Sequence, residues 1–243
     1  MKRKILSSTS INTYLRCPRK YYLKYIKGLK EKPSIYLIRG KAVHDTIARF
    51  HHLEAQDQMN FEQMKTDLLS LFNHYWLKQE DEIRMLGLAE QTLDEYYRES
   101  AEMLIGWLKR YIKATMNGQT KPETEVKLIS ETHRVMGVID AIHNNNGEAL
   151  LTDYKTSKKD TLTHDIKVQM AIYALIYKDN YGVLPNEIII DFLKHQTPIT
   201  FKVSEEFPQY AIKLCKEIHE KTSSQNEQDY PCTCGGWCEK DFL

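Results

Sequence analysis

Asp140, Asp153 and Lys155 lie in two neighbouring segments that both have the composition of strands. Side chains alternate along a strand, so Asp153 and Lys155 share one face, Tyr154 takes the other, and Asp140 can reach the first face across a short turn. Two carboxylates this close repel each other unless a cation lies between them, and oxygen ligands suit Mg²⁺ or Mn²⁺. Such an ion would activate a water and neutralise charge on a phosphoryl oxygen, while Lys155 could orient that water or stabilise the transition state. The alternative is a surface hairpin with an exposed Asp–Lys ion pair.

Three further polar residues could serve the same site. Gln169 and Tyr173 are four residues apart and share one helix face, where they offer amide and hydroxyl groups to a phosphate or a base. His44 could supply a nitrogen ligand to the same ion. Each also has a simpler explanation: the polar edge of an amphipathic helix for the pair, and a packed or surface histidine for His44.

Five cysteines are placed unevenly along the chain. Cys17 lies near the start, and Cys232, Cys234 and Cys238 crowd the end. In a cytosolic chain such clustering favours a metal site over disulfides. Cys215, within a helical segment, is interpreted as a small buried hydrophobic residue, although it could replace one of the other four as a ligand.

The net charge of +1 conceals a strong asymmetry. Residues 1–32 hold ten Lys or Arg and one acid, whereas residues 54–102 hold twelve acids and four Lys or Arg. The basic segment would attract a polyanion such as nucleic acid, and the tyrosines among its charges suit unpaired bases. An amphipathic helix whose tyrosines face the core fits the same pattern, so both interpretations stay open.

Membrane and secretory segments are not evident. No apolar run reaches the roughly 18 residues of a membrane span, and the first ten residues lack the apolar core of a signal peptide. We therefore expect a cytoplasmic protein.

The elements that must position the candidate residues fall into four segments. Residues 1–53 are expected to form basic helices that pack on the core, with Ser8 or Ser10 as the first N-cap, a break at Pro18 and a later helix from Gly40. Residues 54–121 are expected to form an inserted lobe of helices, spanning 61–78 and 88–116.

The third segment, residues 122–221, alternates strands and helices. Strands are expected over 126–133, 135–143 and 148–156, with an asparagine–glycine turn at 144–147. A helix over 163–180, strands over 187–193 and 199–203, and a helix over 205–221 follow. Residues 222–243 form a cysteine-rich tail. The sequence thus predicts an α/β core with helices packed on or beside it.

The order of these motifs resembles that of the RecB-like branch of the PD-(D/E)XK nucleases. That branch includes CRISPR-associated RecB-like exonucleases, the AddB helicase–nuclease subunit and mitochondrial single-strand exonucleases. The resemblance covers nearly the whole chain and consists of SINTYLRCPRKYY at 10–22, RG at 39–40 with His44, GVID at 137–140, DYK at 153–155, and Gln169 with Tyr173. It implies a restriction-endonuclease-like core with a mixed central sheet flanked by helices.

The resemblance implies a role for each matching residue in the site. His44, Asp140 and Asp153, with the backbone carbonyl of Tyr154, would bind Mg²⁺ or Mn²⁺. Asp140 and Asp153 would be catalytic together with Lys155, the catalytic lysine.

The resemblance also implies a [4Fe–4S] cluster on Cys17, Cys232, Cys234 and Cys238. The family spacing of the last three cysteines is C-x2-C-x5-C, whereas this chain has C-x-C-x3-C. A four-cysteine Zn²⁺ site is therefore the alternative.

These features together predict a metal-dependent DNA nuclease, specifically an exonuclease on single-stranded DNA or single-stranded ends. Gln169 and Tyr173 would line the site toward the DNA, and Arg19, Lys20 and Lys24 would bind its phosphates. The alternatives are a catalytically inert DNA-binding module on the same fold and a structure-specific endonuclease. Recombination, repair and CRISPR adaptation all remain open as settings, with a helicase or an adaptation protein as partner.

Overall fold

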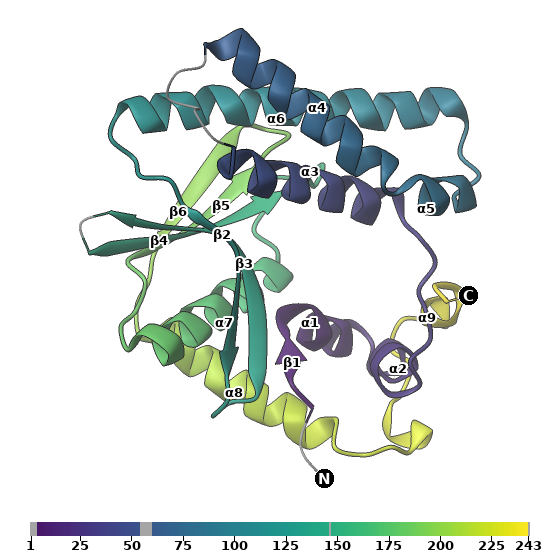
Figure 1. The fold of residues 1–243 in the computed structure, drawn as a ribbon. Helices are drawn as coiled ribbons and strands as arrows, with labels where there is room; N and C mark the ends of the chain where they lie inside the picture. Colours follow the sequence, from purple (N-terminus) through teal and green to yellow (C-terminus); the bar gives the residue numbers. More distant parts are fainter. Residues whose placement is uncertain (1–3, 54–59, 146, 243) are drawn as a thin grey trace.

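The computed structural model describes residues 4–53, 60–145 and 147–242 (Figure 1). Lys2 and Arg3 of the basic segment, Glu54 at the expected start of the lobe and Asn146 of the expected turn lie outside the described residues. Within them the elements are, in chain order, β1 (Leu6–Ser7), α1 (Ser8–Arg16), α2 (Pro18–Tyr21), the π-helical turn η1 (Tyr22–Ile26), α3 (Ile35–His51), α4 (Phe61–Leu77), α5 (Glu80–Met85), α6 (Glu90–Met116), β2 (Glu123–Ser130), β3 (Val135–Asn145), β4 (Glu148–Lys155), α7 (His164–Tyr181), β5 (Glu187–Phe192), β6 (Thr197–Lys202), α8 (Glu206–Lys221), the 3₁₀ turn η3 (Glu227–Asp229) and α9 (Trp237–Lys240).

A six-stranded mixed sheet forms the centre of the molecule. Its order is β1-β3-β4-β5-β6, and β2 also pairs with β3. The β1–β3 and β4–β5 pairs are parallel, and the remaining pairs are antiparallel. Because parallel neighbours need a crossover, α7 connects β4 to β5 across one face of the sheet. The predicted mixed sheet flanked by helices is confirmed.

Helices cover the two faces of the sheet and give each face its own apolar core. In Figure 1, α7 and α8 lie on one side of the strands and α3, α4 and α6 on the other. Ile139 and Ile172 belong to the first core, whereas Phe50, Leu104 and Tyr154 belong to the second. Strands β3 and β4 contribute to both cores, so Asp140 and Asp153, in the covered part of these strands, are buried.

Two helix starts differ from the sequence-based expectation. The N-cap of α1 is Ser7, which forms a reciprocal capping box with Ser10, rather than Ser8 or Ser10 itself. Helix α3 begins at Ile35 instead of Gly40, because Ile35 and Ile38 extend its buried face by more than a turn. The start of α1 is therefore decided locally by its capping box, whereas tertiary packing moves the start of α3 upstream.

Other boundaries follow local signals as expected. Asn60 and Gln63 form the predicted capping box at the start of α4. Gly182 ends α7 with φ of 77°. Helix α5 was not predicted, and it buries none of its residues, so it leaves no apolar stripe in the sequence. No helix in the described part of the chain is both long enough and apolar enough to cross a bilayer.

Candidate active site

The candidate catalytic residues lie where β3 and β4 separate. Pairing between the two strands runs from Asn145–Glu148 to Ala141–Thr152. Just beyond this point, the backbone N–H of Tyr154 donates a hydrogen bond to Oδ2 of Asp140 at 2.7 Å. The Asp140 carboxylate thus takes the place of a backbone acceptor and ties β4 to β3 at the site. The ring of Tyr154 packs in the second core, on the face opposite Asp153 and Lys155, as strand alternation predicts.

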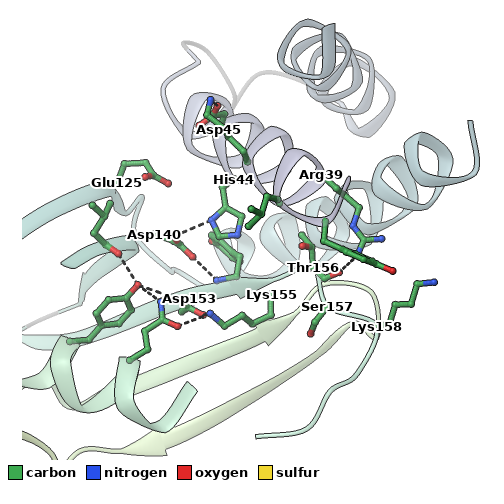
Figure 2. Close-up of a pocket in the computed structure, with 18 residues that line it drawn as sticks. Arg39, His44, Asp45, Glu125, Asp140, Asp153, Lys155, Thr156, Ser157 and Lys158 are labelled. Carbon is green, nitrogen blue, oxygen red and sulfur yellow. Dashed lines mark hydrogen bonds and ion pairs between the residues drawn. The ribbon is translucent and has the colours of Figure 1, made fainter. Parts of the chain in front are cut away.

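Three side chains from three elements converge beside this point (Figure 2). Nδ1 of His44, on α3, lies 3.1 Å from Oδ1 of Asp140. Ligand atoms of His44, Glu125 and Asp140 all lie within 4.8 Å of one another. We call these three residues the hard-ligand cluster, because carboxylate oxygens and an imidazole nitrogen are donors that Mg²⁺ or Mn²⁺ accepts. The residues present therefore fit a divalent ion.

Glu125 was not assigned a role from the sequence, because the strand was expected to begin at Val126. In the structure it lies within β2, opposite Asp140 in the register that pairs Thr124 with Ala141. Its φ of 53° is in the left-handed region, which a non-glycine residue rarely adopts at no cost. The sequence pattern that could have indicated a role for Glu125 is its spacing from Glu123, because acids at i and i+2 share one face of a regular strand.

The charges within this group influence one another strongly. Burial lowers the pKa of His44, but the adjacent Asp140 carboxylate outweighs it and raises that pKa to about 9. Burial raises the pKa of Asp140, yet the charge and hydrogen bond of His44 bring it below its usual range. Burial keeps the pKa of Asp153 raised despite Lys155 beside it. Asp140 is thus the more readily ionised acid of the two, and a cation at the site would lower the pKa of Asp153 as well.

Asp153 is held apart from the hard-ligand cluster by a network from α7. Oδ2 of Asp153 lies 2.6 Å from Nζ of Lys155, an ion pair without the angles of a hydrogen bond. Nε2 of Gln169 donates to Oδ1 of Asp153 at 2.8 Å, and Oε1 of Gln169 accepts from Lys155 at 2.7 Å. The hydroxyl of Tyr173 donates to the carbonyl of Val138 at 2.7 Å and lies 3.2 Å from Asp153. Gln169 and Tyr173 therefore position Asp153 and Lys155 in this structure.

Gly137 explains how α7 approaches the sheet closely enough to make these contacts. A Cβ at this position would lie 2.8 Å from Cδ1 of Ile176 and 3.2 Å from Cε1 of Tyr173. Any larger residue would push α7 away from β3, and with it the hydroxyl of Tyr173. The glycine that opens the GVID motif thus acts through packing rather than through chemistry.

Arg39 links the site to the lobe of helices. It is 1% exposed, donates to the carbonyl of Thr156 at 2.5 Å and pairs with Glu99 of α6 at 3.2 Å. Lys194 contacts the other oxygen of Glu99 at 3.0 Å. Because Thr156 follows Lys155 directly, this contact holds the start of the β4–α7 loop against α3.

Two neighbouring cavities meet at the β4–α7 loop. The catalytic cavity, of about 830 Å³, contains the hard-ligand cluster, Asp153 and Lys155, and is also lined by Tyr36, Leu37 and Lys158. The second, of about 550 Å³, shares Lys155, Ser157, Lys158 and Gln169 with the first. We call it the basic cavity, because its charged lining consists of Arg16, Lys155, Lys158, Lys159 and a single acid, Asp165.

The basic cavity also offers uncharged polar groups. Five hydroxyl residues line it: Ser8, Thr9, Ser157, Thr161 and Thr163. Asn12, 6% exposed, donates from Nδ2 to the carbonyl of Asp165 at 3.1 Å, and its Oδ1 has no hydrogen-bond partner among the described residues. A buried acceptor beside the lysines and hydroxyls suits a ligand that carries both oxyanions and a donor group.

The three basic residues predicted to bind phosphates are held in ion pairs with acids. Arg19 pairs with Glu227 and with Glu239, and Lys20 pairs with Asp241 at 2.7 Å. Lys24 pairs with Glu31. Much of the positive charge near the start of the chain is thus balanced within the protein, chiefly by its own C-terminal tail.

The tyrosines of the same segment face the core. Tyr14, Tyr21 and Tyr22 are at most 8% exposed and pack around Tyr230, with ring centroids 6.4, 6.3 and 5.1 Å from it. For these three rings the structure supports the interpretation of an amphipathic helix rather than a surface for bases.

The predicted cysteine cluster assembles from the two ends of the chain. The sulfurs of Cys17, Cys232, Cys234 and Cys238 all lie within 4.8 Å of one another. Cys215 lies elsewhere, in the first apolar core, where burial raises its pKa to about 12. We call the four grouped residues the cysteine cluster. Its assembly is confirmed, and Cys215 is the small buried residue expected.

Comparisons with known proteins agree with this geometry. A crystal structure of a protein from Eubacterium rectale, provisionally described as an exonuclease, superposes with a TM-score of 0.59 at 12% identity, covering 99% of this chain and 89% of that one. The structure of SSO0001 aligns over 61% of this chain and 70% of its own at 17% identity, but its TM-score of 0.32 is too low to indicate a shared fold. No curated protein matches the sequence significantly. The family model of the PD-(D/E)XK nuclease superfamily matches residues 5–240. With its acids and lysine on adjacent strands of the matching fold, the chain belongs to the PD-(D/E)XK nuclease superfamily.

Proposed function

We propose that the protein is a Mg²⁺- or Mn²⁺-dependent deoxyribonuclease that degrades single-stranded DNA from an end. The observation that carries the proposal is that Asp140, Asp153 and Lys155 lie together between the hard-ligand cluster and the basic cavity. An acidic cluster suits the metal, and a basic cavity suits the phosphates that flank the scissile bond.

The protein groups divide the work of hydrolysis. The hard-ligand cluster would hold the ion, with Asp153 as a further ligand. The ion would supply Lewis-acid activation of water and of the phosphoryl group. The ammonium of Lys155 has three N–H donors, and its contacts among the described residues are to Asp153 and Gln169. A third donor is thus left for a phosphate oxygen, where it would stabilise charge that develops during attack.

The DNA backbone would pass through the basic cavity. Lys158 and Lys159 are exposed and form no ion pair within the described residues, so their charges are available to phosphates. The hydroxyl side chains would donate to phosphate oxygens, and Oδ1 of Asn12 would accept from the hydroxyl of a terminal sugar. Such contacts position a strand without reading its sequence.

Two exposed apolar side chains that line the catalytic cavity support a preference for single strands. Tyr36 is 53% exposed and Leu37 is 66% exposed, and both line the cavity. The ring of Tyr36 is braced edge-on by Tyr96, with centroids 5.9 Å apart. A base can stack on such a ring only when it is unpaired, and one such contact is worth about 1–3 kcal/mol.

A comparison of four substrates tests the proposal. The protein with Mn²⁺ should degrade linear single-stranded DNA and leave covalently closed single-stranded circles intact, with duplex and RNA of the same sequence cut more slowly. Asp153→Asn is the matched inactive control. Cleavage of the circles would replace the exonuclease by an endonuclease, and metal-dependent DNA binding without cleavage of any substrate would leave an inert binding module.

A second experiment tests the path of the strand. Lys158→Gln with Lys159→Gln should weaken binding of single-stranded DNA and lower the slope of log K against log salt by about 1.4, since each lost phosphate contact removes about 0.7. Lys213→Gln with Lys216→Gln, two exposed cations of α8, should leave the slope unchanged. Equal slopes for the two double variants would place the strand elsewhere.

A further inference from the structure

The cysteine cluster has a geometry that bears on which metal it holds. Sγ of Cys232 lies 3.6 Å from Sγ of Cys234 and 3.6 Å from Sγ of Cys238. Cys17, 2% exposed, contributes the fourth sulfur, and all four sulfurs lie within 4.8 Å of one another. The four sulfurs therefore surround a single small volume.

That volume matches one tetrahedral ion. Four sulfurs about 2.3 Å from a central Zn²⁺ lie about 3.8 Å apart at the corners of a tetrahedron. In a [4Fe–4S] cluster each cysteine binds a different iron, so the whole iron–sulfide cube lies between the sulfurs and holds them farther apart. The close sulfurs fit the single ion and do not fit the cube that the family resemblance implies.

The loop that carries three of the ligands explains why the sulfurs are so close. Two consecutive glycines, Gly235 and Gly236, have φ of 67° and 84°, so the chain reverses between Cys234 and Cys238. The turn directs the backbone N–H of Gly236 to Sγ of Cys232 at 3.3 Å and that of Cys238 to Sγ of Cys234 at 3.2 Å. Hydrogen bonds of this kind stabilise metal-bound thiolates in zinc sites and in iron–sulfur sites alike. The short C-x-C-x3-C spacing therefore builds a compact loop.

The opposite wall is the start of α2. Cys17 is the residue before Pro18, and the tail is held beside it by a hydrogen bond from the hydroxyl of Thr233 to the carbonyl of Arg16 at 3.0 Å. A backbone hydrogen bond from Arg19 to the carbonyl of Pro231 at 3.3 Å adds to it. These contacts hold the backbone of both walls side by side around the small volume.

We infer that the cysteine cluster of this chain binds one Zn²⁺ with four thiolates, and that the ion is a structural link between the two ends of the chain. A closed four-cysteine shell leaves no position for water or substrate, so the ion has no part in cleavage. The inference concerns a site separate from the hard-ligand cluster and does not depend on the proposed nuclease activity.

Metal analysis of the whole chain tests the inference. Protein produced in medium with both iron and zinc, and purified without oxygen, should be colourless and contain one zinc and less than 0.1 iron per chain. After replacement by Co²⁺, it should show sulfur-to-cobalt charge-transfer bands and the visible bands of tetrahedral cobalt. A brown protein with about four irons and a broad visible absorption would overturn the inference, as would a chain that binds neither zinc nor cobalt.

Variants locate the ion. Cys234→Ala should lose the cobalt bands or show those of a three-sulfur site, whereas Cys215→Ala, the matched control in the apolar core, should keep one zinc and the four-sulfur spectrum. If a variant fails to fold, the metal content and cobalt spectrum of the unmutated protein still decide between one zinc and four irons. Zinc retained in full with an unchanged spectrum in Cys234→Ala would place the ion elsewhere and overturn the assignment.

Discussion

Two clusters of side chains that could bind a metal ion lie in the described part of the chain, and they differ in what holds them together. The hard-ligand cluster draws one residue each from α3, β2 and β3, elements fixed by the sheet and by the second apolar core. The cysteine cluster draws on residue 17 and on a tail whose described residues include one short α-helix, α9, of four residues. The sheet and the second apolar core therefore hold the hard-ligand cluster in place, whereas a metal ion at the cysteine cluster would itself hold the two ends of the chain together. Loss of a ligand should accordingly affect chemistry at one site and stability at the other.

The largest expected effect is on catalysis. Asp153→Asn or Lys155→Met should reduce cleavage by about 10³-fold or more, since the first removes a predicted ligand of the ion and the second removes the positive charge beside the reacting phosphate. The melting temperature should stay within a few degrees of the unmutated value, because the surrounding β3–β4–α7 packing remains. Single-turnover cleavage and thermal melts measure the two quantities, and EDTA on the unmutated protein should match the variants. Activity close to normal in either variant would remove the site from the mechanism.

The next effect is on stability, at the other cluster. Cys17→Ala should lower the free energy of unfolding by about 3–5 kcal/mol, because a link across some 215 residues no longer restricts the unfolded chain. Cleavage per folded molecule at low temperature should be unchanged. Urea unfolding with and without a strong zinc chelator measures this, and Cys215→Ala serves as the control. A variant that melts normally but has lost activity would reverse the comparison.

Glu125 tests whether the hard-ligand cluster is complete as described. Glu125→Gln should weaken Mn²⁺ binding by about 10–100-fold, as loss of a ligand or its close support does. Calorimetric titration of Mn²⁺ in the absence of DNA measures it. Glu123→Gln, two residues along the same strand, should bind Mn²⁺ normally. Equal Mn²⁺ affinities in the two variants would show that Glu125 is not a ligand and that His44, Asp140 and Asp153 form the site without it.

Acid should weaken the region behind the hard-ligand cluster through His51. Burial lowers the pKa of His51 to about 3, below the roughly 6.5 of an unfolded chain. Between these values the unfolded state binds a proton that the folded state does not, so stability falls as pH falls. From pH 7 to pH 5 the loss from this group should be at most about 2 kcal/mol. Urea unfolding at several pH values should give a smaller slope for His51→Phe, and an unchanged slope would attribute acid lability to other groups.

The smallest effect concerns the basic residues near the start of the chain. Arg19→Gln with Lys20→Gln should cost about 1 kcal/mol or less for each pair lost to the tail acids, since these side chains are partly exposed. The salt dependence of DNA binding should barely change, in contrast to Lys158→Gln with Lys159→Gln. A lower slope in the Arg19 and Lys20 variant would support their predicted contact with DNA.

The sequence by itself determined the features that depend on local periodicity. Strand alternation placed Asp153 and Lys155 on one face and Tyr154 on the other, and helical spacing placed Gln169 with Tyr173. Turn and capping signals at Asn60 and Gly182 marked helix ends correctly. These are short-range consequences of backbone geometry, so a single sequence is sufficient to read them.

Only the tertiary structure decided which distant residues meet. His44 contacts Asp140 across 96 positions, and Arg19 and Lys20 are paired with acids more than 200 positions away. Glu125 joins the hard-ligand cluster because the antiparallel register of β2 and β3 sets it opposite Asp140. No local pattern specifies such pairings, because they depend on how separate elements pack and on which charges that packing brings together.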